Sequence, residues 1–460
     1  MSAALRPVST SPLESEDHSA FFAWLRLKEY ARLDRVNEAY LDFTGSALYA
    51  DAQITAHSER MRRGVFGNPH SENGPSKLST EIIEEARERV LAFLDAPRDE
   101  YVVCFTANTT AAIKIVAESY RFGPRAPLVL SADNHNSMNG LREFARRGGS
   151  GVRYINLDTE LRLRDAEEVL DEMSGGRGLL GFPAQSNFSG VKHPLELVSI
   201  ARSRGYSVLL DAAAYLPTNA LSLSQCPADF VALSAYKILG YPTGVGALVV
   251  RKQSLARLER PWFAGGTVEY ASVQHSRHLL RPGSEAFEDG TPAFLSIAAV
   301  CDGLEFIESV GYERIDSHVS GLTEYLLVGL QALRRADGSP LVELHGPADT
   351  RLRGGTLAFN VMQREGTTVP FAAVVDRARE AGVSLRGGCF CNPGAAEAAF
   401  QFPADAMATC LDRAGRNFSI DGLSECLGPE VPVGAVRASV GIATNEADID
   451  RALEVISSFA

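Results

Sequence analysis

Two side chains of opposite charge follow successive apolar runs in the middle of this sequence. Asp211 lies in the run YSVLLDA (206–212), and Lys237 follows the run DFVALSA (229–235) and begins a glycine-rich segment. A carboxylate at the end of a buried strand is costly unless a cation or a hydrogen-bond donor meets it. An amine held in a partly apolar loop can lose its proton and form a Schiff base with a carbonyl. The pair therefore indicates Schiff-base chemistry.

A third group of residues that could do chemistry lies upstream, where Asn108, Thr109 and Thr110 come after the apolar run YVVCFT. These residues are expected to open a helix, whose free N–H groups and dipole favour an anion such as phosphate. Pyridoxal phosphate (PLP) needs a lysine, a carboxylate for its pyridinium nitrogen and donors for its phosphate. A threonine pair alone is usually a helix cap, and a lone Asp or Lys usually lies on the surface. In this order on successive strands, the three features predict a PLP site.

The elements that must position these residues follow from an alternation of apolar runs and helical patterns between Tyr101 and about Arg251. The predicted strands are YVVCFT, PLVLSA, VRYINL, GLLGFP, YSVLLDA, DFVALSA and GVGALVV. Helix-like stretches such as 110–120 and 193–205 lie between several of them. This alternation predicts a mostly parallel, doubly wound α/β sheet with helices on both faces. Sites in such sheets lie at the carboxyl ends of the strands, where the candidate residues fall.

The chain is predicted to divide into a tail and two domains. Residues 1–20 are rich in Ser, Pro and acidic residues and are expected to form a flexible tail. Residues 21–292 would form the large domain that binds PLP. Beyond it, two long helical stretches precede the short strands VELHG, TLAFNV, VSLRG and VRASVGI, and a last helix begins near Glu446. This pattern predicts a smaller α/β domain over 293–460.

Composition and motifs argue against several other classes of protein. The chain has 45 Lys and Arg against 57 Asp and Glu, and this net charge of −12 argues against a nucleic-acid partner. No run approaches the roughly 18 apolar residues of a membrane span, and the N-terminus does not look like a secretory signal. The seven cysteines are scattered, so we expect a cytoplasmic protein. The sequence has no GxGxxG after a strand and no GxxxxGK[ST], so we expect no nucleotide-phosphate loop. It also has no CxxC pair and no HExxH, so we expect no metal site.

Several longer segments resemble a known family. The most specific are PAQSNFSGVK and GCFCNPGA, and the others are YLDFTGSAL, GNPHSENGPSKL, FTANTTAAIKIVAE, DNHNSMNGLR, LDAAAYLPTNALSL, YKILGYPTGVGAL and FEDGTPAFL. Together they resemble the class V, fold-type I PLP enzymes, and within them the N-terminal cysteine desulfurase domain of molybdenum cofactor sulfurases. The resemblance extends from Tyr40 to the last helix. It implies a fold-type I PLP-transferase and a homodimer whose active sites lie at the subunit interface.

The resemblance implies a role for each matching residue around the cofactor. Lys237 would bind PLP covalently and later move protons at the substrate Cα, and Asp211 would pair with the pyridinium nitrogen. His135 would stack on the ring, although a plain loop histidine is an equal interpretation without the family. Asn187 would hydrogen-bond the phenolic oxygen. The phosphate would be bound by four hydroxyl side chains, those of Thr109, Thr110, Ser234 and, across the subunit interface, Thr291.

The resemblance also implies which residues handle the substrate. Arg437 would bind the substrate carboxylate by a bidentate fork. In desulfurases a loop thiolate attacks the sulfur of the bound cysteine, which leaves alanine and a persulfide. In LRGGCFCNPG the number of residues from Arg386 aligns this nucleophile with Cys391 and not with Cys389. Arg386 is a candidate for the cationic group that lowers the pKa of Cys391. Cys389 is either a bystander or a resolving thiol, and the alternative for both cysteines is a pair of buried small hydrophobes. No role is expected for the remaining cysteines, Cys104, Cys226, Cys301, Cys410 and Cys426.

The chain departs from the family pattern at a few positions. Tyr236 stands where the usual desulfurase has His before its lysine, and Ala214 replaces the usual Gln; the sulfurase branch shares both features. Ala396 and Glu397 stand where that branch often has a third cysteine. We see no counterpart of the second domain that binds the molybdenum cofactor. We therefore expect sulfur to pass to a separate acceptor protein or pathway.

The leading interpretation is a PLP-dependent cysteine desulfurase or sulfurtransferase that converts L-cysteine, or a related amino acid, to L-alanine with a persulfide on Cys391. The first alternative is a class V aminotransferase, epimerase or lyase that kept the loop cysteines without using them. The second is a protein of this fold retained as a partner or scaffold. The intact set of Lys237, Asp211 and Asn187 argues against the second alternative.

Overall fold

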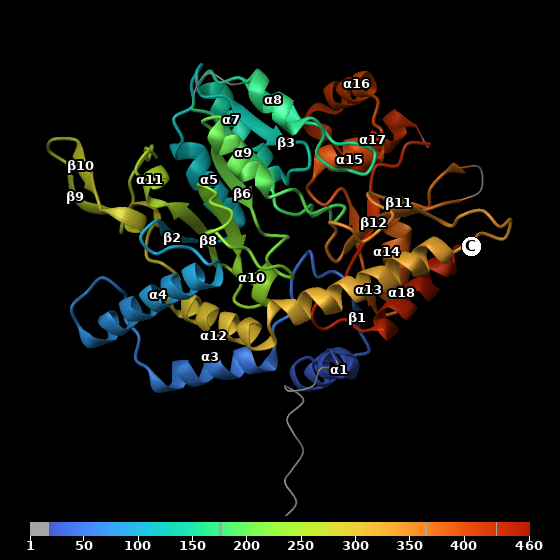
Figure 1. The fold of residues 1–460 in the computed structure, drawn as a ribbon, viewed down its shortest axis with the longest axis horizontal. Helices are drawn as coiled ribbons and strands as arrows, with labels where there is room; N and C mark the ends of the chain where they lie inside the picture. Colours follow the sequence, from blue (N-terminus) through green and yellow to red (C-terminus); the bar gives the residue numbers. More distant parts are fainter. Residues whose placement is uncertain (1–17, 174–176, 364–365, 429) are drawn as a thin grey trace, which may run out of the picture.

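The computed structural model describes residues 18–460 apart from 174–176, 364–365 and 429. Most of the predicted tail over 1–20 therefore lies outside the described residues, whereas 18–20 form the start of helix α1 (His18–Glu29). Figure 1 shows a central sheet surrounded by helices, with a second group of strands and helices beside it.

The central sheet contains all seven strands that the apolar runs predict, in the order β2-β8-β7-β6-β5-β3-β4. These strands are β2 (Tyr101–Thr106), β3 (Leu128–Ser131), β4 (Val152–Ile155), β5 (Leu179–Pro183), β6 (Ser207–Asp211), β7 (Phe230–Ser234) and β8 (Gly246–Arg251). From β7 to β4 all neighbours pair in parallel. Strand β8 runs antiparallel to both β7 and β2. The mostly parallel sheet is thus confirmed, with one reversed strand.

Apolar side chains on both faces bury this sheet between helices. Successive residues of a strand point to opposite faces, and Leu209 and Leu210 of β6 accordingly belong to two different core clusters. The first face is covered by α5 (Thr109–Ser119), α6 (Asn136–Asn139) and α7 (Leu141–Arg147). The second is covered by α4 (Gly74–Phe93), α8 (Ala166–Glu172), α9 (Glu196–Ser203) and α12 (Phe294–Val310). This double cover explains why the strands are continuous apolar runs.

A smaller antiparallel sheet lies in the C-terminal part of the chain. Its order is β11 (Val342–His345), β12 (Thr356–Val361), β15 (Ala435–Ser439) and β14 (Arg386–Gly388). Beside it, β1 (Ala39–Tyr40) pairs in parallel with β13 (Val383–Ser384), and Asp42 forms a further bridge with Ser439 of β15. The neighbouring helices are α13 (Tyr312–Ala332), α14 (Phe371–Glu380) and α18 (Glu446–Ser457). The domain boundary after residue 292 stays a prediction.

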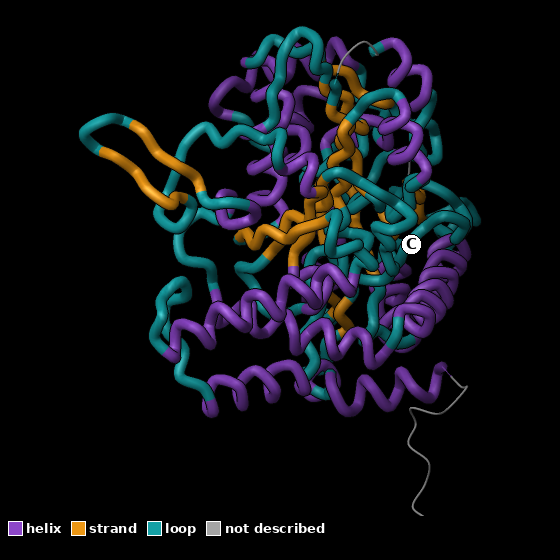
Figure 2. Tube along the Cα trace, turned by 60° about the vertical axis from the view of Figure 1, so that its left-hand side comes forward, coloured by secondary structure: helices purple, strands orange, loops and turns teal. Residues whose placement is uncertain are grey.

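A hairpin of β9 (Val268–Ser272) and β10 (Arg277–Leu280) projects from the body of the molecule, as Figure 2 shows. Val273 at its tip is 97% exposed. The remaining helices are α2 (Arg32–Arg35), α3 (Asp51–Arg63), α10 (Ala235–Leu239), α11 (Lys252–Leu255), α15 (Pro393–Ala399), α16 (Ala404–Ala414) and α17 (Ile420–Leu427). Within the described part of the chain, none of the helices combines the length and the apolarity that crossing a membrane requires.

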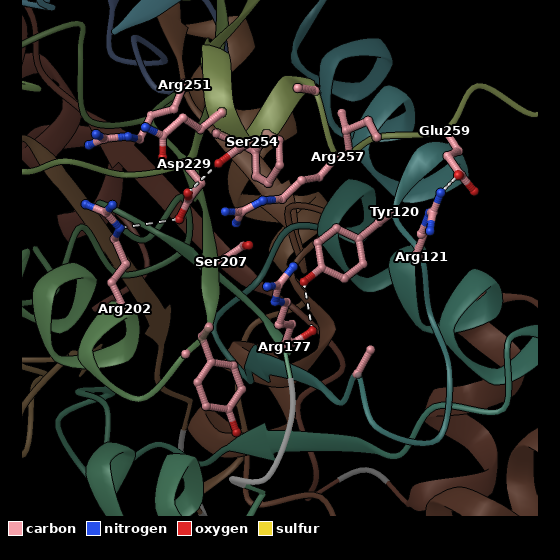
Figure 3. Close-up of a pocket in the computed structure, with 17 residues that line it drawn as sticks. Tyr120, Arg121, Arg177, Arg202, Ser207, Asp229, Arg251, Ser254, Arg257 and Glu259 are labelled. Atoms are coloured by element: carbon pink, nitrogen blue, oxygen red, sulfur yellow. Dashed lines mark hydrogen bonds and ion pairs between the residues drawn. The ribbon is translucent and has the colours of Figure 1, made fainter.

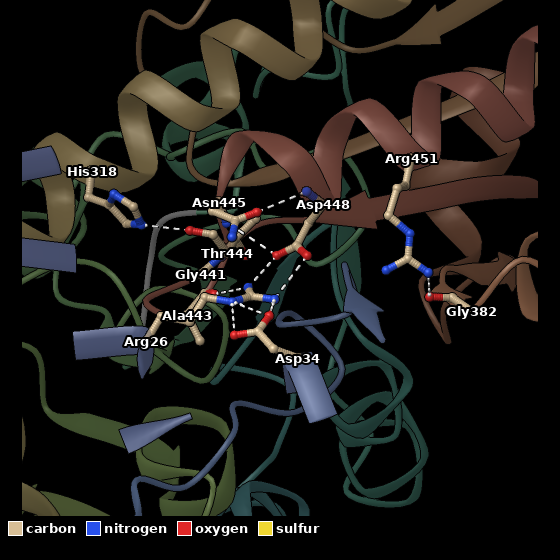
Figure 4. A network of polar contacts seen from close by, with 10 residues as sticks. All are labelled: Arg26, Asp34, His318, Gly382, Gly441, Ala443, Thr444, Asn445, Asp448 and Arg451. Atoms are coloured by element: carbon tan, nitrogen blue, oxygen red, sulfur yellow. Dashed lines mark hydrogen bonds and ion pairs between the residues drawn. The ribbon is translucent and has the colours of Figure 1, made fainter. Parts of the chain in front are cut away.

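A buried arginine joins the two ends of the described chain (Figure 4). Arg26 of α1 donates from Nη1 to Asp448 Oδ2 of α18 at 2.5 Å and to the carbonyl oxygen of Ala443 at 2.6 Å, and from Nε to Asp34 Oδ1 at 3.0 Å. Arg26 is 6% exposed, and a cation so buried is tolerated only when anions and acceptors surround it. The network fastens α1 to α18 and therefore anchors the N-terminal segment beside the small sheet.

Candidate active site

The residues predicted to hold PLP meet at the carboxyl ends of β5, β6 and β7. A cavity of about 180 Å³ lies there. It is lined by Asn108, Thr109, Thr110, His135, Ser137, Pro183, Gln185, Asn187, Asp211, Ala213, Ala214, Ser234, Tyr236 and Lys237. Every predicted PLP-binding residue except Thr291 is among them, so the fold brings together side chains that are far apart in the sequence.

Lys237 and Asp211 come together because their strands are neighbours. Strand β6 ends at Asp211, which pairs with Ala232 of β7, and α10 with Lys237 begins directly after β7. Burial lowers the pKa of Lys237 from its ordinary value, the charge of Asp211 opposes this shift, and Arg437 and Arg386 add to it. A lowered pKa increases the neutral fraction of the amine, which is the form that attacks a carbonyl.

His135 is held at the cavity wall by its own helix start. It is the residue before α6, and its Nδ1 accepts the backbone N–H of Ser137 at 3.1 Å. Burial lowers the pKa of this imidazole, Asp211 opposes the shift, and Lys237 adds to it. A neutral ring with Nδ1 as the acceptor carries its proton on Nε2. The ring is therefore held in one orientation with its neutral form favoured, and it can stack on an aromatic cofactor.

The predicted phosphate site is the N-terminus of α5. The side chain of Asn108 caps this helix by accepting the N–H of Ala111 at 3.0 Å. Thr109 donates its N–H to Ser234 Oγ at 2.8 Å, and the two hydroxyl oxygens lie 2.7 Å apart. A Cβ added to Gly246 would lie 2.6 Å from the Asn108 backbone, so only glycine lets β8 approach this loop so closely. The helix dipole and these hydroxyl groups form a site for an anion.

Taken together, the groups around the cavity fit PLP. They comprise an amine of lowered pKa, a carboxylate at 7% exposure, a neutral imidazole and a helix start with hydroxyl groups. In the same order, these groups match four chemical features of that cofactor, namely its aldehyde, its ring nitrogen, its ring face and its phosphate.

A cluster of charges borders the cavity on the side of the small sheet. Arg437 of β15 donates from Nη2 to Asp42 Oδ1 at 2.9 Å and from Nη1 to the carbonyl oxygen of Asn187 at 2.8 Å. Its Nε is buried and has no hydrogen-bond partner among the described residues. Arg386 of β14 donates from Nε to the same carboxylate of Asp42 at 3.0 Å. Arg437 therefore keeps N–H donors available for a carboxylate while Asp42 holds its position.

Asp42 is a site residue that the sequence analysis missed. It lies in YLDFTGSAL, a segment that matched the family without a role attached. Its place beside Arg437 comes from backbone pairing, since Ser439 donates its N–H to Leu41 at 2.7 Å and Phe43 donates to Ser439 at 3.4 Å. Only the resemblance of its segment to the family could have drawn attention to Asp42, because 395 residues separate it from Arg437 in the sequence.

Hydrogen bonds to its backbone carbonyl oxygens hold the cysteine loop at the edge of the cavity. Asn187 donates from Nδ2 to the carbonyl oxygen of Phe390 at 2.7 Å. Asn136, next to His135, donates its backbone N–H to the carbonyl oxygen of Cys391 at 2.7 Å. Phe390 and Cys391 both have positive φ, of 53° and 57°, a region that non-glycine residues adopt rarely. The loop thus presents Cys391 beside the residues that line the cavity, and one N–H of the Asn187 amide is used for this.

The two loop cysteines differ in their surroundings. Cys391 is exposed, whereas Cys389 is partly buried and its Sγ lies 3.2 Å from the carbonyl oxygen of Val433. Burial raises the pKa of Cys389 to about 11, and the neighbouring Cys391 adds to this shift. A thiol of raised pKa holds little thiolate at neutral pH. Of the two, Cys391 has the accessible sulfur.

One expectation about the other cysteines is wrong. Cys410 of α16 and Cys426 of α17 form a disulfide, so this pair has a structural role that was not expected. Their helices lie side by side, and two helices carrying one cysteine each give no sequence pattern for pairing. Three other cysteines, Cys104, Cys226 and Cys301, are buried and free.

Thr291 is the predicted cofactor residue that the described chain does not bring to the cavity. It lines a separate cavity of about 340 Å³ together with Lys114 and Glu288. A role for Thr291 across a subunit interface stays a prediction. Among the described residues, no cluster of three or more His, Cys, Asp or Glu could hold a metal ion.

The comparisons with known proteins agree with this geometry. The family model for class V aminotransferases matches residues 39–452. Molybdenum cofactor sulfurase 3 of Aedes aegypti is 38% identical over 456 residues, which are 93% of this chain and 57% of that protein. The molybdenum cofactor sulfurase of Drosophila melanogaster is 36% identical over 469 residues, covering 94% of this chain and 59% of that protein. The chain thus spans less than two thirds of the length of these relatives.

A solved structure shows the same fold. The apo structure of a cysteine desulfurase from Thermococcus onnurineus NA1 has a TM-score of 0.76 at 24% sequence identity, over 95% of this chain and 97% of that chain. This likeness confirms the fold-type I arrangement expected from the sequence. With the family model matched over nearly the whole described chain, this protein belongs to the class V aminotransferases, a family of PLP-dependent enzymes.

Proposed function

We propose that this protein is a PLP-dependent cysteine desulfurase that releases sulfur from L-cysteine, forms L-alanine and leaves a persulfide on Cys391. The observation that carries the proposal is the position of Cys391. It is an exposed thiol whose loop is hydrogen-bonded to Asn136 and Asn187, both beside the Lys237 cavity. A class V enzyme that transfers amino groups needs no such thiol. The names of the relatives described above support the same reaction class.

In this proposal, the residues of the cavity hold PLP by its chemical features. Lys237 would bind it covalently, Asp211 would keep its ring nitrogen protonated, and His135 would lie against its ring. The start of α5, with Thr109 and its partner Ser234, binds its phosphate. When bound, PLP supplies an electron sink next to the substrate Cα. The amine of Lys237, once free, can take the Cα proton, because a lowered pKa increases the fraction of the amine that is neutral and able to accept it.

Arg437 would bind the substrate carboxylate. Its buried Nε has no partner in the described chain, and Asp42 fixes the guanidinium from one side. A planar guanidinium that keeps unused N–H donors matches a carboxylate. Binding there would place the substrate thiol toward the Cys391 loop, because Arg437 packs 4.7 Å from the ring of Phe390, the neighbour of Cys391.

The sulfur step is carried out by Cys391 on the substrate. Cys391 loses its proton, and its thiolate forms a new S–S bond with the sulfur of the substrate while the substrate Cβ–S bond breaks. The electron pair of that bond stays with the carbon, which then takes one proton to become the methyl group of alanine. The proton released by Cys391 balances this uptake, so no external oxidant or reductant is needed. The persulfide sulfur would then pass to an acceptor that we expect to be a separate protein or pathway.

We also propose that the active enzyme is a homodimer. Thr291 lies outside the cavity that holds the other phosphate-binding residues, so its predicted role requires a second subunit. The projecting β9–β10 hairpin supports this assembly, since Tyr270 and Leu279 on it are 65% and 67% exposed. Exposed apolar side chains on one projecting element are typical of an interface.

The proposal is tested by incubating the PLP-loaded protein with L-cysteine and measuring alanine together with the mass of the Cys391 peptide. We expect alanine and a persulfide on Cys391 in equal amounts before a reductant is added. The matched control is Cys389→Ser, which should form both. Turnover of another amino acid without a persulfide would instead indicate an aminotransferase, epimerase or lyase.

A further inference from the structure

A second cavity lies at the opposite end of the central sheet from Lys237. Its volume is about 680 Å³, and Ser207 and Phe230, the first residues of β6 and β7, are in its wall. The last residues of the same two strands, Asp211 and Ser234, line the proposed PLP cavity. Four steps along a strand separate the two ends, or roughly 13 Å at about 3.3 Å per residue. This cavity is therefore separate from the active site.

The lining of this cavity is basic although the chain as a whole is acidic. Five arginines contribute to it, against the two acids Asp229 and Glu259, in a chain of net charge −12. The arginines are Arg121, Arg177, Arg202, Arg251 and Arg257. They come from helix α9, the end of strand β8 and loops between residues 121 and 257, and the fold collects them at one place.

Three of these arginines already have counter-charges. Arg121 forms an ion pair with Glu259, Arg251 pairs with Glu100, and Arg202 lies 3.7 Å from Asp229. Asp229 is occupied within the wall, because it accepts the Ser254 hydroxyl at 2.6 Å and the Val208 N–H at 3.0 Å. The acids of the cavity are thus bound by neighbouring groups.

The other two arginines, Arg177 and Arg257, have no acidic partner within ion-pair distance among the described residues. Figure 3 shows both side chains reaching into the cavity, between Asp229 and Tyr120. The Tyr120 hydroxyl donates to the backbone carbonyls of Arg177 and Gly178, at 3.0 and 2.8 Å, which fixes the segment that carries Arg177. Two guanidinium groups that reach into one hollow without acidic partners can bind an anion there.

We propose that this cavity binds a small ligand of nucleotide size that carries at least two phosphate groups. Guanidinium groups match phosphate in a bidentate manner, and two unpaired ones can bind two phosphates at once. A volume of about 680 Å³ lies within the range of roughly 300–1,000 Å³ for sites that enclose a small organic ligand. The Tyr120 ring offers an apolar wall for the rest of that ligand. This proposal does not depend on the proposed desulfurase activity.

The test uses PLP-loaded protein, so that the phosphate site of α5 is already filled. Binding of ADP, pyrophosphate and adenosine is measured by calorimetry and by the shift in Tm. We expect ADP and pyrophosphate to bind and to raise Tm, and adenosine to have no effect. In the double variant Arg177→Gln and Arg257→Gln the affinity for ADP should fall on the order of a hundredfold, about tenfold for each guanidinium. Arg146→Gln, an exposed arginine on α7, is the matched control and should bind like the wild type.

Three results would overturn the proposal. The first is no binding of ADP or pyrophosphate by the wild type, and the second is equal binding by the double variant. The third is tighter binding of a single-stranded RNA oligomer than of ADP, which would assign the arginines to a polymer. Unchanged absorbance of bound PLP and unchanged Tm without ligand would show that the double variant is folded, so that loss of binding can be attributed to Arg177 and Arg257.

Discussion

We predict that Asp42 contributes to substrate binding, because it holds Arg437, the residue that would bind the substrate carboxylate. The bond between Asp42 Oδ1 and Arg437 Nη2 measures 2.9 Å, and the two side chains are 12% and 3% exposed. Asp42→Asn keeps the shape and one acceptor oxygen but removes the charge. Burial lowers the pKa of Arg437 and Asp42 opposes that shift, so the variant leaves a buried cation with less compensation.

The size of the effect follows from this geometry. A buried hydrogen bond to a charged group contributes about 1.5–3 kcal/mol, which corresponds to roughly a tenfold to hundredfold change in binding. The bond of Asp42 to Arg386 adds little, since the Arg386 side chain is 49% exposed and surface pairs are weak. We therefore expect KM for cysteine to rise at least about tenfold in Asp42→Asn, with a much smaller change in kcat.

The assay is steady-state alanine formation over a range of cysteine concentrations, with Tm measured in parallel. The control is Asp302→Asn, which weakens a pair with Arg60 at 2.7 Å outside the cavity, in which the Asp302 side chain is 6% exposed. That variant should lower Tm without changing KM. Two results would refute the reasoning: a lower Tm with unchanged KM in Asp42→Asn would make Asp42 only structural, and a lower KM would mean that it competes with the substrate for Arg437.

The remaining predictions concern the nucleophile, the cofactor lysine and pH. Cys391→Ser should still bind PLP but lose persulfide and alanine formation by on the order of a hundredfold or more, whereas Cys389→Ser should lose much less; equal rates for the two variants would contradict the assignment. Borohydride treatment of the PLP-loaded protein should leave the pyridoxyl group on the Lys237 peptide in mass spectrometry, and a label on any other lysine would be contrary. Burial lowers the pKa of His318 from 6.5 to about 4 while its Nε2 lies 3.0 Å from the Thr444 carbonyl oxygen. Because the unfolded chain then binds the proton more tightly, this group destabilises the protein as pH falls from about 6.5 toward 4, and His318→Gln should flatten the fall of Tm over that interval.

The strands of the large sheet could be predicted because burial on both faces leaves a direct signal in the sequence. Every predicted run from Tyr101 to Arg251 is a strand. The reversal of β8 could not be predicted in the same way. A continuous apolar run shows that a strand is buried, but its direction depends on which neighbours it pairs with.

Site residues that follow their own strand could be predicted from the sequence. Site residues whose role depends on a contact between distant segments could not. Lys237 and Asp211 carry local signals, an amine before glycines and a carboxylate after an apolar run. Asp42 carries none, since its role comes from a backbone bridge to Ser439. The Cys410–Cys426 disulfide was missed for a related reason, because two helices must pack before the two thiols can meet.

The same contacts explain why a substrate site depends on both ends of the described chain. Arg437 comes from the penultimate element and Asp42 from the segment after β1, and their bond requires that this segment lie along β15. In the chain, α1 precedes the Asp42 segment and α18 follows β15, and the Arg26 network holds these two helices together. The alignment of the carboxylate-binding arginine therefore rests on long-range packing. Loosening Arg26 from Asp448 should disturb substrate binding before it disturbs the cavity for PLP, whose walls come from the large sheet.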